Sequence, residues 1–321
     1  MSTEIRSWAP LALFIFKRPE HTRQVITSLQ GCTGFDESPI YVFADGPRRP
    51  EDLPAIQETH AEARRLLGDR AVFVERETNL GVDSSIIAGV TELCDRYGEV
   101  IVVEEDLILS PGFLQFLNAG LQRYEHEPRV MQVCAHMFDV PELRESRDAI
   151  LLPMISSLGW GTWKRAWDQF DPEASGWQKR LSDDRERRRF DLDGNYKYTR
   201  MLSHHMHARV PAWDIRWYYS VFARDGLALF PPRTLVLHEY DGTGTHDRFS
   251  LPVHQAQLET RAAFDLPDQI AETPAKEHVF RAIGAFRPSS LLHKSIAIAK
   301  FALRRTGKGH RAKNDRSDHA N

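Results

Sequence analysis

Residues 100–110 read VIVVEEDLILS, and this stretch decides how the rest of the chain is interpreted. Its first four residues, Val100 to Val103, are branched and apolar, which predicts a strand buried on both faces. Glu104, Glu105 and Asp106 follow at once, so the predicted strand ends in three adjacent carboxylates. Like charges packed together are unfavourable unless a positive charge offsets them.

A divalent cation is the simplest offset for this acidic turn. Mg²⁺ and Mn²⁺ prefer carboxylate oxygens together with phosphate oxygens, and such a cation can bridge a diphosphate. The alternative is a solvated acidic turn, with Ser110-Pro111 starting the next helix. The turn alone does not decide between the two, but its position after a buried strand favours the metal site.

Three similar apolar runs precede this strand: LALFIF at 11–16, IYVF at 40–43 and AVFV at 71–74. The stretches between them, at 19–30, 51–67 and 82–96, predict helices, the last because its apolar residues recur at helical spacing. Apolar strands that alternate with helices predict an α/β fold with a mostly parallel, Rossmann-like sheet and helices on both faces.

Polar residues follow each of these strands. Arg18 comes after the first, Asp45 after the second, and Arg76 and Asn79 after the third. Ligands of such sheets bind beyond the carboxyl ends of the strands, where these residues converge with the acidic turn. We therefore expect a site for a ligand that is both hydrogen-bonding and anionic.

The overall composition excludes several classes of protein. The chain has 321 residues and a net charge of −3, so no nucleic-acid partner is expected. Cys32, Cys94 and Cys134 are odd in number and far apart, which fits neither a disulfide framework nor a zinc site and favours a reducing compartment. No run approaches the roughly 20 apolar residues of a membrane span, and 11–16 is too short for a signal peptide. Cytoplasm is the default expectation.

The second half of the chain is rich in tryptophan. Six of the seven tryptophans lie here: Trp160, Trp163, Trp167, Trp177, Trp213 and Trp217. They serve either as core or as faces on which a sugar ring stacks. A charged helix is expected near 181–190 and a strand at 227–230. His204, His205 and His207 fit an exposed helix better than a metal site, and 242–246 (GTGTH) is either a turn or a closing loop.

The C-terminal part carries a basic amphipathic stretch at 291–305 (LLHKSIAIAKFALRR). Such a helix either docks on the catalytic domain or lies on an anionic membrane surface, which gives a peripheral location at the inner membrane. Residues 307–321 are expected to form a disordered basic tail.

Taken in order, several motifs resemble one family. They are FIFKRPEHTR (14–23), DGP (45–47), NLG (79–81), VEEDLILS (103–110), LGWGTWKRAW (158–167), FDLDGNYKYTRM (190–201), WDIRWY (213–218) and DGTGTH (241–246). Together they resemble bacterial family 2-type glycosyltransferases related to N-acetylglucosaminyltransferase I, over about three quarters of the chain.

The resemblance implies a GT-A fold over residues 1–250, with a nucleotide-binding half at about 8–128 merged with an acceptor half at about 129–250. A C-terminal helical extension would occupy 251–306. It also implies an inverting reaction that uses a nucleotide sugar and Mn²⁺ or Mg²⁺. The donor would be UDP-linked, UDP-GlcNAc for example, and the acceptor a glycan or lipid-linked glycan in bacterial surface polysaccharide synthesis.

Residue roles follow from the same resemblance. Asp106 matches the metal-binding aspartate of a Glu-Asp-Asp-Leu motif, and Glu105 departs from that motif, which puts finer contacts to ribose or sugar in doubt. Asp214 matches the catalytic base. The nucleotide-sugar contacts are assigned to Arg18, Asp45, Asn79, Glu104, Glu105, Trp160 and Trp213. Apart from the resemblance, closure of the 242–246 loop over the donor would make His246 a possible loop contact to the diphosphate or metal.

Two other functions remain open. A nucleotidyltransferase that makes sugar nucleotides shares this type of sheet, but it carries a glycine-rich loop after the first strand, where this chain has Lys17-Arg18-Pro19-Glu20. A non-catalytic protein that binds a sugar nucleotide or glycan on the same fold is the second alternative.

Overall fold

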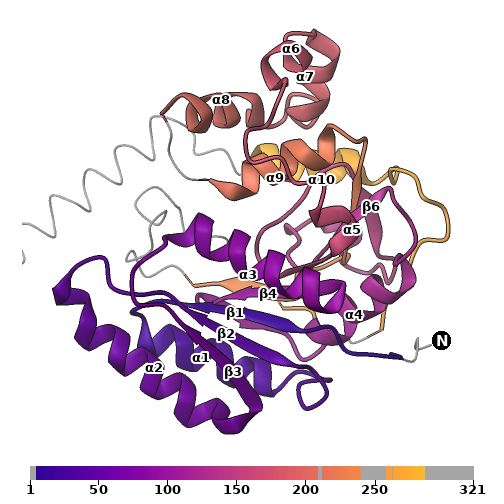
Figure 1. The fold of residues 1–321 in the computed structure, drawn as a ribbon. Coiled ribbons are helices and arrows are strands. Elements are labelled where there is room, and N and C mark those ends of the chain that lie inside the picture. Colours follow the sequence, from indigo (N-terminus) through magenta and orange to yellow (C-terminus); the bar gives the residue numbers. More distant parts are fainter. Residues whose placement is uncertain (1–4, 209–211, 240–257, 262, 286–321) are drawn as a thin grey trace, which may run out of the picture.

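The computed structural model describes residues 5–208, 212–239, 258–261 and 263–285. Within them, the first four strands are parallel: β1 (Leu11–Ile15), β2 (Ile40–Ala44), β3 (Ala71–Glu75) and β4 (Glu99–Glu104). The helices between them are α1 (Pro19–Gln30), α2 (Leu53–Leu67) and α3 (Val82–Tyr97). Figure 1 shows α1 and α2 on one side of these strands and α3 on the other. The α/β fold with a mostly parallel sheet is confirmed.

The sheet has eight strands in the order β3-β2-β1-β4-β8-β6-β9-β7. β8 (Trp160–Trp163) runs antiparallel between β4 and β6 (Val130–Cys134). β9 (Leu227–Phe230) is parallel to β6, and β7 (Ile150–Leu152) pairs antiparallel with β9. Because β8 bonds directly to β4, one continuous sheet joins the two halves of the chain.

A second, two-stranded sheet pairs β5 (Leu107–Leu109) with β10 (Val236–His238), His238 opposite Leu107. β5 follows the acidic turn directly, so this pairing brings the end of β10 beside residues 104–106. α4 (Phe113–Arg123) begins shortly after β5.

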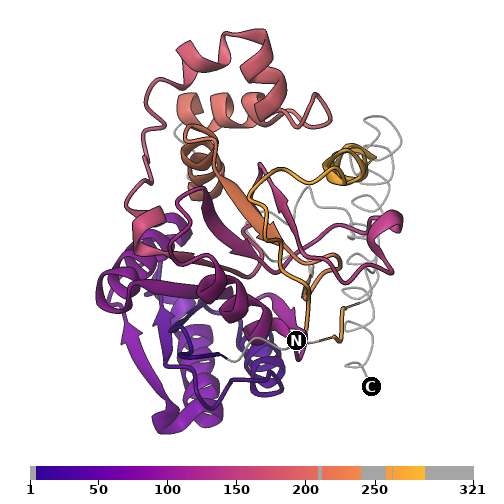
Figure 2. The ribbon, with the colours of Figure 1, turned by 90° about the vertical axis from the view of Figure 1, so that its right-hand side faces the viewer.

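The remaining helices belong to the second half of the chain. They are α5 (Lys164–Trp167), α6 (Trp177–Leu181), α7 (Asp184–Phe190), α8 (Tyr198–Ala208), α9 (Trp213–Phe222) and α10 (Lys276–Ala285). Figures 1 and 2 both place α6, α7 and α8 at the end of the molecule opposite α1 and α2. No helix among the described residues is long and apolar enough to cross a lipid bilayer.

Two apolar clusters make up the core. The larger one surrounds the parallel strands and includes Trp160, Trp167 and Trp217. The smaller one lies under α7, α8 and α9, where the Phe190 and Tyr218 rings stack at 4.6 Å. The tryptophans are therefore mostly core, the commoner of their two expected uses.

The expected elements agree closely with the observed ones. The strand expected at 227–230 is β9, and the histidine-rich stretch lies on α8, where His204 and His207 are exposed and His205 is half-buried. The charged helix expected at 181–190 begins later, at Asp184, because the Asp183 side chain caps it by accepting the backbone N–H groups of Arg185 and Glu186. Residues 246, 291–305 and 307–321 lie outside the described part of the chain.

Gly89, on α3, permits close contact between this helix and the sheet. A Cβ atom at Gly89 would lie 2.7 Å from Phe14 and 3.2 Å from Phe43, and these two rings stack on each other at 5.1 Å. Gly→Ala within a helix ordinarily stabilises by up to about 1 kcal/mol. Here we expect Gly89→Ala to destabilise by about 1–3 kcal/mol, because the buried rings cannot move away.

Urea unfolding measures this difference, with Glu92→Ala, exposed on the same helix, as the control. The control should change the unfolding free energy by less than about 0.5 kcal/mol. A stabilised Gly89→Ala protein would mean that α3 does not lie so close to the sheet.

Candidate active site

The acidic turn at the end of β4 is held by two basic side chains. The Arg18 guanidinium, just before α1, lies 3.1 Å from the Asp106 carboxylate and 3.8 Å from that of Glu105. The imidazole Nε2 of His238, at the end of β10, lies 3.2 Å from the Asp106 carboxylate. These side chains are only 13–20% exposed, so the contacts are shielded from water. The predicted convergence of Arg18 with the acidic turn is confirmed.

The three carboxyl groups differ in their pKa. Burial, and then the neighbouring carboxylates, raise the pKa of Glu104 well above its ordinary value, and burial and Asp106 raise that of Glu105 to about 8. Burial acts on Asp106 in the same direction, but His238 and Arg18 outweigh it and hold its pKa below the ordinary value. Asp106 is therefore the carboxyl group of the turn whose ionised form the neighbouring basic side chains favour.

The donor set around Asp106 suits a cation that keeps open positions. One ionised carboxylate and one imidazole lie together, and the described residues contain no group of three or more His, Cys, Asp or Glu arranged to hold a metal alone. Mg²⁺-type cations commonly bind one or two carboxylates and take further oxygens from a phosphate ligand. The residues therefore fit a metal that is completed by a bound diphosphate.

His238 was not singled out by sequence reasoning, which proposed His246, a residue outside the described part. The signal for His238 lies in the pairing of two short strands, β5 and β10, that are far apart in the sequence. A strand-like stretch at 235–238 (LVLH) hints at β10, but its partner cannot be read from a single sequence.

Asp45 and Asn79 lie in the loops that follow the neighbouring strands β2 and β3. The Asp45 carboxylate accepts backbone N–H groups from Gly46, Leu80 and Gly81 at 2.9–3.1 Å. The Asn79 side-chain amide donates to the Gly46 carbonyl and accepts from Arg48, both at 3.0 Å. Both residues thus lie at the predicted edge, and their contacts fix the start of α3.

α9 carries the predicted base, Asp214, in its first turn. The Trp213 ring stacks on Trp160 at 5.2 Å, and Arg216 forms an ion pair with Asp83 of α3. The Asp214 carboxylate does not pair with Arg216. Within the described residues it accepts one hydrogen bond, from the backbone N–H of Ile215 at 2.8 Å.

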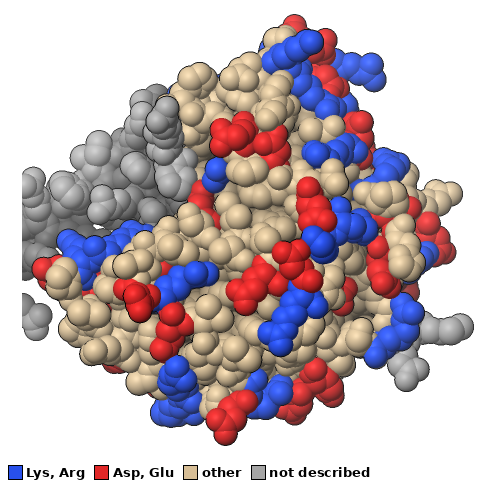
Figure 3. Space-filling view, in the orientation of Figure 1, with Lys and Arg blue, Asp and Glu red and all other residues tan. Residues whose placement is uncertain are grey.

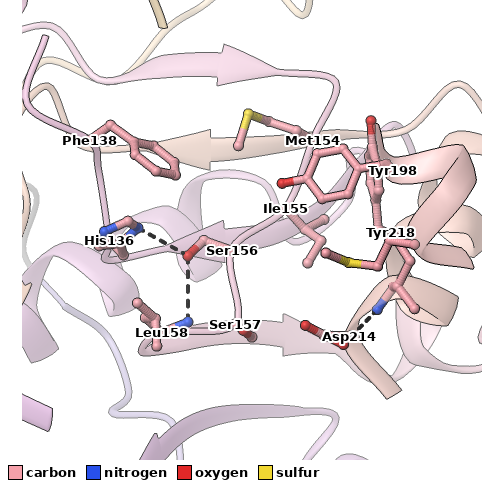
Figure 4. Close-up of a pocket in the computed structure, with 12 residues that line it drawn as sticks. His136, Phe138, Met154, Ile155, Ser156, Ser157, Leu158, Tyr198, Asp214 and Tyr218 are labelled. Atoms are coloured by element: carbon pink, nitrogen blue, oxygen red, sulfur yellow. Dashed lines mark hydrogen bonds between the residues drawn. The ribbon is translucent and has the colours of Figure 1, made fainter. Parts of the chain in front are cut away.

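Asp214 faces a pocket of about 170 Å³. Figure 4 shows Asp214 at one end of this pocket and His136 at the other, with Ser156 and Ile155 between them and Met154 and Tyr198 above. The His136 ring lies 3.3 Å from the Ser156 hydroxyl, and burial, followed by the nearby His238, lowers its pKa to about 4. The charge of Asp214 also contributes to the raised pKa of Glu104, so the pocket lies within electrostatic range of the acidic turn.

The predicted residues therefore fall into three groups. Arg18, Glu104, Glu105 and Asp106 share one cluster, Asp45 and Asn79 form the adjoining loop, and Trp160, Trp213 and Asp214 lie along α9 and β8. The residues that sequence reasoning missed are His238, the Asp83–Arg216 pair, and His136 and Tyr198 of the pocket.

Comparison with known proteins gives no family model that matches the chain and no matching curated protein. Among solved structures, GalNAc-T7 with UDP, GalNAc and Mn²⁺ superposes with a TM-score of 0.47 and 10% identity over 73% of this chain. The chain spans 44% of the length of that protein. The mannosyltransferase PcManGT from Pyrobaculum calidifontis, in complex with GDP-Man and Mn²⁺, superposes with a TM-score of 0.36 and 10% sequence identity. The match covers 68% of this chain and 69% of that protein.

A putative nucleotide-diphospho-sugar transferase from Desulfovibrio desulfuricans G20 gives a TM-score of 0.34 and 15% identity, covering 52% of this chain and 68% of that one. All three are likenesses of fold at 10–15% sequence identity.

The Asp83–Arg216 ion pair joins α3 to the helix that carries Asp214. The two side chains are 10% and 19% exposed, and Asp83 also accepts the backbone N–H of Trp213. Asp83→Ala leaves Arg216 and that N–H without their partner, so we expect a loss of about 1–3 kcal/mol in the free energy of unfolding. Urea denaturation provides the measurement.

Asp95→Ala is the matched control, because it removes an ion pair with Lys164 that is about half exposed. Its cost should stay within roughly 0–1 kcal/mol. Equal losses for the two variants would show that the Asp83–Arg216 pair does not hold α9 in place.

Proposed function

We propose that this chain is a metal-dependent, inverting glycosyltransferase that moves a sugar from a nucleotide-sugar donor to a hydroxyl group of a glycan or glycolipid. One observation carries the proposal. An ionised Asp106, held by Arg18 and His238 at the end of β4, lies within electrostatic range of a pocket that presents the carboxylate of Asp214. Asp106 with its partners suits the diphosphate of a donor, and Asp214 suits the hydroxyl group of an acceptor.

Asp106 and His238 would hold the cation. When bound, Mn²⁺ or Mg²⁺ supplies positive charge that stabilises the departing diphosphate. Arg18 offers a planar fork of N–H donors for the same phosphate oxygens, and its contact with Asp106 places that fork at the metal site. Asp45 and Asn79 adjoin this position and remain the proposed contacts of the nucleotide, which the sequence resemblance makes a uridine.

Asp214 would act as the general base. Its carboxylate faces the pocket and is not neutralised by Arg216, so it can take the proton of an acceptor hydroxyl. As that O–H bond breaks, the acceptor oxygen bonds to the anomeric carbon of the donor sugar. The bond from this carbon to the diphosphate oxygen breaks, and the electron pair leaves with the nucleoside diphosphate. A single displacement of this kind inverts the anomeric configuration.

The stacked rings of Trp160 and Trp213 lie beside this position. Trp160 is fully buried and Trp213 nearly so, so they pack as apolar core beside Asp214 and would exclude water from that side of the acceptor. A non-catalytic protein that binds sugar nucleotides would have no use for a base at this point. The UDP-sugar identity, the surface-polysaccharide pathway and a peripheral position at the inner membrane belong to the same proposal and rest on the sequence resemblance.

The donor side is tested by calorimetric titration with UDP, with and without Mn²⁺. We expect micromolar binding that requires the metal, and a loss of about 10- to 100-fold in affinity in both Asp106→Asn and His238→Ala, because each removes a ligand. Asp95→Asn, outside the site, is the control. Titrations with GDP and dTDP identify the base if UDP does not bind. If no nucleotide binds under any condition, the donor-site proposal is wrong.

The role of Asp214 is tested by Asp214→Asn, which keeps the size of the side chain but removes its basicity. We expect kcat to fall by about 10²- to 10⁴-fold while the Kd for UDP and Mn²⁺ stays within about twofold. Hydrolysis of UDP-GlcNAc and related UDP-sugars provides the readout until an acceptor is found. Native turnover by this variant would remove Asp214 from the mechanism, and metal-dependent binding without any turnover in the native protein would favour the non-catalytic alternative.

A further inference from the structure

The pocket beside Asp214 has a lining that is specific in its chemistry. Most of the lining side chains are apolar or aromatic: Phe138, Met154, Ile155, Leu158, Met201, Ile215, Tyr198 and Tyr218. The polar ones are Asp214 at one end and His136, Ser156 and Ser157 toward the other (Figure 4). A ligand here therefore meets apolar surface over its faces and hydrogen-bonding groups at its ends.

The hydroxyl groups of the two tyrosines differ in availability. The Tyr218 hydroxyl donates to the Phe190 carbonyl at 3.1 Å, so the surrounding core occupies it. The Tyr198 hydroxyl has no hydrogen-bond partner within the described residues, although its side chain lines the pocket. A ligand hydroxyl group is the kind of partner that this position can accept.

The described residues that line the pocket carry charge of one sign. Asp214 is the one acidic residue among the described lining residues, which include no lysine or arginine. Beyond the lining, Asp83 and Glu104 lie within electrostatic range, and Arg216 is the cation paired with Asp83. An anionic ring in this pocket would be buried against a carboxylate without a counter-charge, which is unfavourable.

The arginines of α6 and α7 do not change this balance. Figure 3 shows basic side chains gathered at the end of the molecule where Figure 1 places these helices, and none of them lines the pocket. Arg180 and Arg189 are paired with Glu186, and Arg189 also with Asp225. Their charge is therefore offset by carboxylates of α7 and of the turn after α9.

We propose that this pocket binds a single uncharged sugar ring, with apolar C–H groups against the aromatic side chains and hydroxyl groups on Ser156 and Tyr198. The inference rests on the proposed function in making this ring the acceptor, whose reacting hydroxyl group lies at Asp214. A pocket of about 170 Å³ suits one ring rather than an extended chain. Uronic acids, sialic acids and phosphorylated sugars are excluded from this position.

Saturation-transfer NMR on the full chain, with UDP and Mn²⁺ present, tests this selectivity. The probes are matched pairs of methyl glycosides that differ only at C6: glucose with glucuronate, and galactose with galacturonate. We expect a neutral member of a pair to receive saturation from the aromatic protons and to bind at least about tenfold more tightly than its acidic counterpart, a difference of about 1.4 kcal/mol.

Two variants assign the effect to this pocket. Met201→Lys adds a positive charge to the lining, so the acidic sugar should then bind as tightly as its neutral counterpart or more tightly. His204→Lys adds a lysine on the exposed face of α8 and should not change the binding of either sugar. Tyr198→Phe keeps the ring and removes the hydroxyl group, so it should weaken the neutral sugar. This second variant keeps the test decisive if Met201→Lys does not fold.

The outcomes separate the two proposals. Equal binding of acidic and neutral sugars, or no sugar binding in a protein that binds UDP with Mn²⁺, overturns the pocket assignment and leaves the donor site standing. Neutral-sugar binding that responds to Tyr198→Phe in a protein that binds no nucleotide supports the pocket and overturns the proposed transferase.

Discussion

The position of Asp106 at the end of β4 is the constraint on which the rest of the site depends. Three consecutive carboxyl groups follow the buried residues Val100–Val103 of β4, and this arrangement is tolerable only if their charge is reduced or offset. Two groups have a raised pKa, and the charge that remains on Asp106 is shared between Arg18 and His238. These partners come from the start of α1 and the end of β10, so the turn holds three distant segments together.

A second series of contacts joins the loop that contains Asp45 to Asp214, the predicted base. Asp45 accepts the backbone N–H groups of Leu80 and Gly81, which fixes the residues that begin α3. Asp83, in the first turn of α3, in turn binds Arg216 and the backbone of Trp213 on α9. Asp214 lies between Trp213 and Arg216 in the sequence, so contacts from Asp83 in the first half of the chain help to determine its position. Gly46 belongs to the same arrangement, because a Cβ atom there would lie 2.6 Å from the backbone of Arg76 and Thr78.

Much of the first half could be predicted from the sequence, because its signals are local. A run such as VIVV indicates a buried strand by itself, and the carboxyl ends of parallel strands must meet at one edge, which predicts that Arg18 lies near Asp106. The reversal of β8 could not be predicted in this way, because its WGTW sequence carries no information on direction. His238 and the Asp83–Arg216 pair depend on contacts between segments far apart in the chain. Asp214 was reached only through a family resemblance, since an aspartate beside a tryptophan is not distinctive.

The contrast between the two sides of the site argues for two different ligands. Around Asp106 the described residues bring together one carboxylate, a guanidinium and an imidazole, a set that suits the proposed diphosphate and cation and leaves metal positions for further oxygens. Around Asp214 the lining is apolar, lacks basic residues among those described, and offers single hydroxyl groups. A protein that only stored a nucleotide sugar would need the first environment and not the second. Their proximity, with the Asp83–Arg216 pair joining α3 to α9, is the arrangement that the proposed transfer between a charged donor and a neutral acceptor would require.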